Sequence, residues 1–349
     1  MKAFGFLSFG HYGHGRGPTD PDARGMLHQA IDLAQAADEL GVNGAYFRVH
    51  HFARQAAAPM PMLAAIAART RRIEVGTGVI DLRYENPLYL AEEAAALDLI
   101  ADGRVALGVS RGSPEQAARG WEAFGYLGSE DPRGADLARD KFDRFLDAVR
   151  GRPMADADPA QFVPGARLAI EPHSPGLIDR IWWGAGTRAT AEWAAERGVN
   201  LMSSTLVTEA DGRPLGELQR EQIDRYREAF AAAGHDRTPR VSVSRSVFPI
   251  VTEQDRMWMQ LRDGGDQIGV IDGFRSTFGR SYVGTPDQLV EQLRADEAVM
   301  AADTLMLTIP SQLGVAANLR ILEGFARHVA PELGWRPNTE GPATGVAAA

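Results

Sequence analysis

The chain has 349 residues, of which 44% are apolar and 24% charged, a composition typical of globular proteins with a large core. Its net charge of −9, without any run of basic residues, argues against nucleic acid or an anionic membrane as a partner. Because the chain has no cysteine, disulfides and thiolate chemistry are excluded.

The first half of the chain alternates predicted strands with predicted helices. The segment 3–9 enters a strand directly, without the charged region and apolar core of a signal peptide, so we expect a cytoplasmic protein. No apolar segment approaches the ~20 residues that are needed to span a bilayer. Three more strands are predicted at 44–49, 73–80 and 104–109, and helices at 22–40, 61–70 and 86–101.

The second half continues this alternation with two interruptions. A longer helical and loop region contains the segment 151–164, which we interpret as an excursion from the fold. One β–α–β unit then covers 181–203. After it we expect helices at 218–233, 286–300 and 315–329, strands at 241–251 and 304–309, a mobile polar insertion at 252–281 and a disordered tail at 337–349.

Eight short strands separated mainly by helices, with no clear linker, predict a single parallel α/β domain over 1–336. Eight strands favour closure into a (β/α)₈ barrel, a TIM barrel with insertions. A doubly wound open sheet is the alternative. Its Gly-x-Gly-x-x-Gly fingerprint has no clean match after the first strand, where the sequence is Phe9-Gly-His-Tyr-Gly-His-Gly15.

The start of the helix in the β–α–β unit has the chemistry of an anion site. Glycines at Gly184 and Gly186 allow close approach of the backbone, and Thr187 and Thr190 add hydroxyls at the N-terminus of the helix. Arg111, at the end of the predicted fourth strand, is placed to bind a phosphate bidentately. The alternatives are an ordinary capped helix and a surface salt bridge. A competing phosphate site lies after strands seven and eight, at 284–285 and 308–314.

Other polar residues follow the ends of the first three strands. In a (β/α)₈ barrel these ends meet at one mouth, so His11 and His50 are candidate catalytic residues. A metal site is disfavoured, because adjacent residues such as His50 and His51 point to opposite faces of a strand and no carboxylate occupies a clear ligand position. A structural role for each histidine is the alternative reading. Further candidates at the same mouth are His14, Asp81, Arg83, Ser110 and 203–205.

Together these motifs resemble the bacterial luciferase-like, flavin-dependent monooxygenases, over about 4–330. The segment 41–52 looks like the second strand of that family, which places its active-site histidine at His50. The segment 73–79 looks like the third strand, whose backbone at Gly78 and Val79 would lie against the flavin ring.

Two further segments extend the resemblance to the cofactor phosphate. The segment 97–112 is similar to a helix and the fourth strand of the family, with Arg111 as the phosphate arginine, and 187–195 looks like its second phosphate-binding segment. The resemblance therefore assigns cofactor binding to Gly78, Val79, Ser110, Arg111, Ser113, Gly186, Thr187, Thr190 and Thr205.

The resemblance implies an enzyme that uses reduced FMN and O₂ to oxygenate a small organic substrate through a flavin hydroperoxide. A separate NAD(P)H-dependent reductase would supply the reduced FMN, and the protein would be a homodimer. His50 would stabilise the hydroperoxide or move a proton, with His11 as a second candidate. Tyr12, Asp81 and Arg83 would line the substrate pocket, and 252–281 would act as a lid.

Three departures from luciferase bear on the reaction. Val49 stands where luciferase has an acidic residue, Ser110 where it has a cysteine, and Thr205 where it has a tryptophan. Light emission from long aldehydes is therefore not expected, whereas flavin binding is. Val79 after Gly78, rather than tandem glycines, favours FMN over a deazaflavin. The alternatives are a deazaflavin-dependent dehydrogenase or reductase on the same barrel and a non-catalytic flavin-binding protein.

Overall fold

Eight parallel strands form a closed barrel in a computed structural model, which describes residues 3–17, 19–112, 116–258, 265–271 and 274–341. Neighbouring strands pair in parallel around the ring, and β10 pairs with both β8 and β14 to close it. The predicted (β/α)₈ barrel is therefore confirmed. Its strands are β1 (Ala3–Ser8), β2 (Gly44–Phe47), β3 (Glu74–Asp81), β4 (Val105–Ser110), β7 (Ile181–Ala185), β8 (Asn200–Ser203), β10 (Val241–Pro249) and β14 (Thr304–Ile309).

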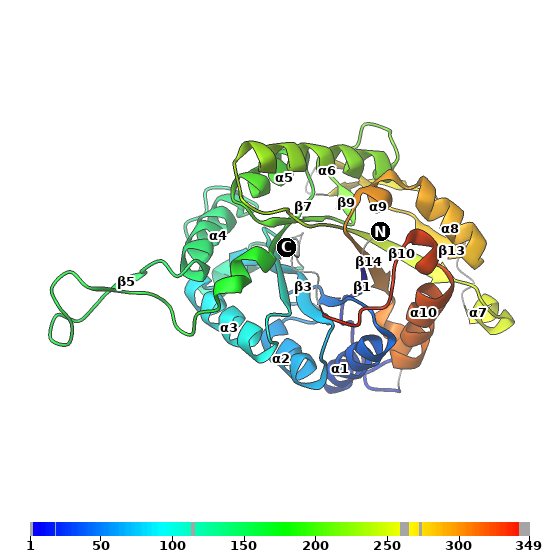
Figure 1. The fold of residues 1–349 in the computed structure, drawn as a ribbon, viewed down its shortest axis with the longest axis horizontal. Coiled ribbons are helices and arrows are strands. Elements are labelled where there is room, and N and C mark those ends of the chain that lie inside the picture. Colours follow the sequence, from blue (N-terminus) through cyan, green and yellow to red (C-terminus); the bar gives the residue numbers. More distant parts are fainter. Residues whose placement is uncertain (1–2, 18, 113–115, 259–264, 272–273, 342–349) are drawn as a thin grey trace.

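Helices surround the barrel and cover its outer face (Figure 1). Asn86 begins one of them as predicted, because its Oδ1 accepts hydrogen bonds from the backbone N–H groups of Leu88 and Tyr89 at 2.9 and 3.2 Å. The helices are α1 (Ala23–Leu40), α2 (Pro59–Arg69), α3 (Pro87–Ile100), α4 (Ala135–Val149), α5 (Arg188–Glu196), α6 (Leu215–Ala232), α8 (Pro286–Ala295), α9 (Glu297–Ala301) and α10 (Gly314–His328).

The single helix expected at 286–300 is divided into α8 and α9. Asp296 stands between them in an extended conformation, and its Oδ1 accepts from the backbone N–H groups of Ala298 and Val299, both at 3.1 Å. This side chain caps the second helix and interrupts the first. Short 3₁₀ helices complete the connections at η1 (Leu82–Tyr84), η2 (Gly120–Phe124), η3 (Pro175–Arg180), η4 (Ser311–Leu313) and η5 (Pro331–Leu333).

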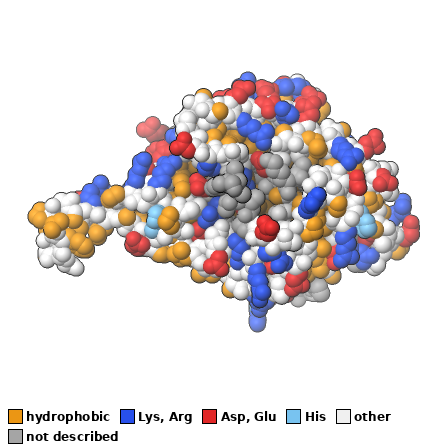
Figure 2. Space-filling model, in the orientation of Figure 1, with side chains coloured by type: hydrophobic (Ala, Val, Ile, Leu, Met, Phe, Trp, Pro, Cys, Tyr) orange, Lys and Arg blue, Asp and Glu red, His pale blue; other side chains and the backbone are white. Residues whose placement is uncertain are grey.

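The excursion predicted at 151–164 is part of an arm that projects from the barrel (Figure 1). Its strands β5 (Ala155–Asp156) and β6 (Arg167–Leu168) pair antiparallel. Hydrophobic side chains gather toward its end (Figure 2), among them Phe162 and Val163, which are 47% and 76% exposed. The arm therefore adds little to the core of the domain.

The insertion expected at 252–281 has more structure than its polar sequence suggests. It contains α7 (Glu253–Trp258), β11 (Gln267–Ile271) and β12 (Phe274–Phe278), and β12 pairs antiparallel with β9 (Leu206–Val207) just after β8. Beyond it, β13 (Ser281–Gly284) pairs in parallel with the end of β10. These pairings attach the C-terminal part of the insertion to β9 and to the end of β10.

The tail predicted to begin at Pro337 is ordered at its start. The backbone N–H of Asn338 donates to the carbonyl oxygen of Gly41 at 2.8 Å, and its side chain is buried. The disordered segment expected from composition therefore does not begin at 337, because this stretch packs on the end of α1.

A cluster of buried residues fills the barrel interior, and a larger one fills the layer between strands and helices. Tyr46 points inward and is fully buried. Gly44 leaves room for its ring, because a Cβ added at Gly44 would lie 2.4 Å from the Tyr46 ring. Of the helices in the described part of the chain, none combines the length and the apolar character needed to cross a membrane.

A buried ion pair closes the amino end of the barrel. Arg240 Nη1 and Nη2 lie 2.6 and 2.9 Å from the two carboxylate oxygens of Glu74, and Tyr46 donates its hydroxyl to the same carboxylate at 2.8 Å. The Arg240 guanidinium also lies 4.8 Å from the centre of the Trp182 ring. Burial alone would lower the pKa of Arg240, but the Glu74 carboxylate raises it, so Arg240 stays charged.

A second buried charge cluster lies below the mouth, where Glu85 follows η1. Burial, with the nearby Glu93 and Asp81 carboxylates, raises the pKa of Glu85 to about 7, although Lys141 opposes the shift. Burial also lowers the pKa of Lys141 to about 8, against the opposing effect of Glu85 and Asp81. The Lys141 ammonium donates to the carbonyl oxygen of Arg83 at 2.7 Å. Ionised Glu85 is thus destabilising in the folded state.

Replacing Arg240 with Met leaves the Glu74 carboxylate buried without its cation, so we expect the free energy of unfolding to fall by about 3–5 kcal/mol. Urea denaturation followed by circular dichroism measures the change. The double variant Glu74→Leu/Arg240→Met removes both charges, so its free energy of unfolding is expected to fall less than that of the single variant. The control is Arg225→Met at an exposed pair on α6. A double variant less stable than Arg240→Met would contradict the prediction.

Replacing Glu85 with Gln is expected to raise the thermal midpoint at pH 8 more than at pH 5. The folded pKa is about 7 against an ordinary value of 4.5, so folded Glu85 binds a proton that the unfolded chain has lost. The destabilisation of the folded state by ionised Glu85 grows as the pH rises from 4.5 to about 7, and it reaches its full size above that pH. Thermal melts at both pH values test this, with the exposed Glu228→Gln as control. Equal shifts at the two pH values would show that Glu85 titrates normally.

Candidate functional site

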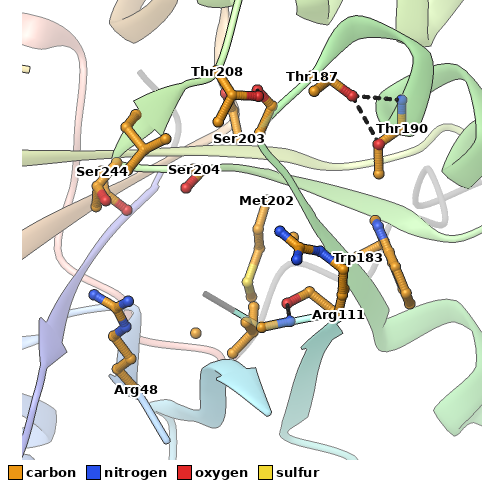
Figure 3. A pocket seen from close by; sticks show the side chains of 18 of the residues that line it. Arg48, Arg111, Trp183, Thr187, Thr190, Met202, Ser203, Ser204, Thr208 and Ser244 are labelled. Carbon is orange, nitrogen blue, oxygen red and sulfur yellow. Dashed lines mark hydrogen bonds between the residues drawn. The ribbon is translucent and has the colours of Figure 1, made fainter. Parts of the chain in front are cut away.

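A large cavity opens at the carboxyl ends of the barrel strands (Figure 3). Its volume is about 970 Å³, at the upper end of the ~300–1,000 Å³ that is usual for small-molecule sites. All eight barrel strands or the turns that follow them contribute lining residues. The cavity therefore lies where (β/α)₈ barrels place their active sites.

One end of the cavity lies at the N-terminus of α5. Thr187 caps this helix, because its Oγ1 accepts from the backbone N–H of Thr190 at 3.1 Å and donates to Thr190 Oγ1 at 2.8 Å. Gly186 lines the cavity beside them. Glu209 also lies here and accepts from the backbone N–H of Arg188 at 2.9 Å. An anion bound at this end would therefore rely on the hydroxyls and on arginine side chains rather than on that backbone donor.

Three arginines line the cavity from β4 and from the start of α4. Arg111 follows the last residue of β4, and Arg133 and Arg139 flank the first turn of α4. The chain turns directly after Arg111 at Gly112, which has a φ of 80°, and a Cβ there would lie 2.1 Å from Asp81 Oδ2. Only glycine fits this turn. The sequence indicated Arg111, whereas Arg133 and Arg139 belong to no motif.

The floor of the cavity is apolar. Val79, Met202 and Met306 line it, and all three belong to the cluster that fills the barrel interior. The peptide bond between Gly78 and Val79 is cis. At Gly184 an added Cβ would lie 3.0 Å from a methyl group of Val79, so glycine keeps this part of the floor open. A flat aromatic ring is the kind of group that such a floor accommodates.

The structure brings together most of the residues that the resemblance assigned to the cofactor. Ser113 lies outside the described residues. Ser110 is buried, and its Oγ accepts from the backbone N–H of Gly112 at 2.7 Å. The assigned residues that line the cavity are Gly78, Val79, Ser110, Arg111, Gly186, Thr187, Thr190 and Thr205.

The two candidate catalytic histidines are placed differently. Neither His50 nor His11 is among the described residues that line the cavity, although both lie near its mouth. His11 Nδ1 is 3.3 Å from Ser311 Oγ, and its Nε2 is 3.1 Å from Gln55 Nε2. Burial, with the charges of Arg48 and His50, lowers the pKa of His11 and so favours the neutral imidazole. Arg48, which the sequence analysis did not single out, lines the cavity from the end of β2.

Tyr12, Asp81 and Arg83, which the resemblance would place in the substrate pocket, are not among the described residues that line this cavity. Asp81 and Arg83 are buried and paired, with Arg83 Nε 2.9 Å from Asp81 Oδ1. Arg83 Nη1 also donates to the carbonyl oxygen of Arg133 at 3.0 Å. This pair supports the loop that carries Arg133, so its role here is structural.

The competing phosphate site after the seventh and eighth barrel strands has other interactions. Thr285 forms a capping box with Gln288 at the start of α8, with its backbone N–H donating to Gln288 Oε1 at 3.0 Å. Neither 284–285 nor 308–314 contributes to the described lining of the large cavity. The anion site indicated at the start of α5 is therefore the one that faces this cavity.

Comparison with known proteins agrees with this geometry. The family model described as luciferase-like monooxygenase matches residues 1–264. Limonene 1,2-monooxygenase of Rhodococcus erythropolis is 23% identical over 94% of this chain and 87% of its own length. With three other curated relatives, the matches cover only 55 to 65% of the relative's length.

Two solved structures share the fold. The oxygenating constituent of 3,6-diketocamphane monooxygenase from Pseudomonas putida, in complex with FMN, superposes with a TM-score of 0.67 at 19% identity, over 95% of this chain and 98% of that chain. The coenzyme F₄₂₀-dependent tetrahydromethanopterin reductase from Methanopyrus kandleri gives 0.64 at 16% identity, over 95% and 99%. The matched family model covers most of the sequence, and this chain belongs to the luciferase-like monooxygenase family.

Proposed function

We propose that this protein is an FMN-dependent monooxygenase that oxygenates a small organic substrate with O₂. The observation that carries the proposal is one cavity that joins an anion site to an apolar floor at the barrel mouth. FMN has a phosphate at one end and a flat ring at the other, which fits that division. The names of two similar proteins, a limonene monooxygenase and a diketocamphane monooxygenase in complex with FMN, support the same reading.

The residues of this chain would divide the binding of FMN between them. Arg111 and the hydroxyls of Thr187 and Thr190 would hold the phosphate, because charge-assisted hydrogen bonds to oxygen anions are the strongest that side chains offer. Val79 and Met202 would support the ring and keep water from one face. Reduced FMN supplies the electrons for oxygen chemistry, and the protein supplies binding, orientation and shielding.

His50 is the proposed proton-transfer residue, with His11 as the second candidate. The two nitrogens of an imidazole ring can accept and donate a proton, which suits that task. The insertion at 252–281 is the proposed lid, since Phe278 at the end of β12 lines the cavity. The proposed partners are O₂, a separate flavin reductase and a second copy of the chain.

A deazaflavin-dependent reductase is the second candidate function, because the fold is shared with a coenzyme F₄₂₀-dependent enzyme. A flavin-binding protein without catalysis is the third. Anaerobic titration with reduced FMN and with a reduced deazaflavin separates the first two, and product analysis after adding O₂ separates the third. Binding of the deazaflavin alone would overturn the FMN proposal.

Arg111→Met is expected to weaken FMN binding by about tenfold to a hundredfold, because it removes charged hydrogen bonds worth about 1.5–3 kcal/mol. Fluorescence quenching of FMN measures the dissociation constant. Riboflavin lacks the phosphate, so its affinity is expected to stay within about twofold. Arg167→Met on the projecting arm is the surface control. An equal loss for riboflavin and FMN would remove Arg111 from the phosphate site.

His50→Ala is expected to lower the yield of oxygenated product per reduced FMN by about a hundredfold, the usual scale of a lost general acid or base. The affinity for FMN is expected to stay unchanged, because His50 is not among the described residues that line the cavity. Single-turnover reactions with chromatographic product analysis measure the yield. Unchanged yield in His50→Ala, with loss in His11→Ala, would transfer the role to His11.

A further inference from the structure

Arg48 occupies the side of the cavity across from the anion site at α5. It follows the last residue of β2. In the ring of strands β2 lies opposite β8, and β8 is the neighbour of β7, the strand that leads into α5. Tyr46, two residues earlier, packs in the barrel interior, and the alternation of a strand puts Arg48 on the same inward face. Figure 3 shows the Arg48 side chain well apart from Thr187 and Thr190.

Neighbouring groups hold Arg48 in place. Its guanidinium carbon lies 4.7 Å from the centre of the Phe9 ring, and Phe9 also lines the cavity. The backbone N–H of Arg48 donates to the carbonyl oxygen of Ser8 at 2.9 Å, which continues the pairing of β1 and β2. A half-buried guanidinium stacked on a ring loses little further freedom when it binds a ligand.

Arginine side chains line both ends of the cavity. Arg48 is one of four lining arginines, the others being Arg111, Arg133 and Arg139. Among the described lining residues Glu209 is the single carboxylate, and it is paired with Arg188 at 3.2 Å. This positive lining occurs in a chain whose net charge is −9. Arg133 pairs with Asp131 at 3.6 Å, and Arg48 lies at the end of the cavity away from the start of α5. The cavity therefore has an arginine side chain at each end, and the one at β2 is placed to meet a second anionic group.

We propose that Arg48 binds the carboxylate of the substrate, and that the substrate is an organic acid with an apolar body. The guanidinium fork matches a carboxylate bidentately. Leu7 lies on β1, the strand next to β2, and Met306 lies on β14, the strand next to β1. Both line the floor of the cavity and suit a hydrocarbon or aryl group. The assignment rests on the proposed function, in which FMN takes the opposite end of the cavity.

The test compares acids with their neutral amides on the FMN-loaded protein by isothermal titration calorimetry. The probes are benzoate with benzamide and octanoate with octanamide. At least one acid is expected to bind about tenfold or more tightly than its amide, from charged hydrogen bonds of about 1.5–3 kcal/mol. Arg48→Met is expected to abolish that preference, and Arg48→Lys to retain part of it. Arg16→Met, at an exposed arginine in the loop after β1, is the control and keeps the preference.

Three results would overturn the proposal. The first is that neither acid binds more tightly than its amide, and the second is that Arg48→Met keeps the preference for the acid. The third is that Arg48→Met weakens FMN binding by more than about tenfold, which would assign Arg48 to the cofactor. Failure of the FMN proposal is recognised separately, because the wild-type protein then fails to bind FMN before any acid is added. In that case the same titrations on the deazaflavin-loaded protein decide the role of Arg48.

Discussion

The ion pair between Glu74 and Arg240 closes the amino end of the barrel, and the rest of the structure depends on that closure. It joins the starts of β3 and β10, which stand on opposite sides of the ring and are 166 residues apart in the chain. Two charges removed from water are tolerated there because each satisfies the other and the Tyr46 hydroxyl adds a donor. With this end filled, the large cavity lies at the carboxyl ends of the strands, where the turns carry the polar side chains.

Along its axis the barrel interior changes from charged to apolar to cationic. Above the ion pair, Tyr46, Trp182 and Met202 form a packed apolar layer. Above that layer lie the lining arginines, which bring cationic side chains to the cavity of a negatively charged protein. In a low-dielectric pocket such charges act more strongly on a ligand than they would at the surface. The division favours a ligand with an anionic end and a flat or apolar body, whichever flavin it proves to be.

Much of the candidate site was predictable because its residues lie next to strand ends. Thr187 caps α5 as its sequence predicts, and Arg111 follows β4 directly, so local pattern and barrel topology place both at one mouth. The histidines show the limit of this argument. The position of His50 after β2 made it a candidate, but the direction of a strand alone does not say which side chain enters the cavity. In the structure the Arg48 side chain lines the cavity. Asp81 and Arg83 satisfy each other below the mouth, a pairing that spacing in the chain did not indicate.

The sequence by itself determined the order and type of the barrel elements, the caps of α3 and α5, and the candidate anion site at the start of α5. These follow from hydrophobic periodicity, glycine and capping residues, which act over a few positions. Only the tertiary structure decided which cationic side chains face the cavity and which charged side chains form ion pairs inside the protein. Arg133 and Arg139 reach the site from α4, and the partner of Glu74 lies on the far side of the ring. Such contacts depend on barrel closure, which brings distant residues together without any local pattern.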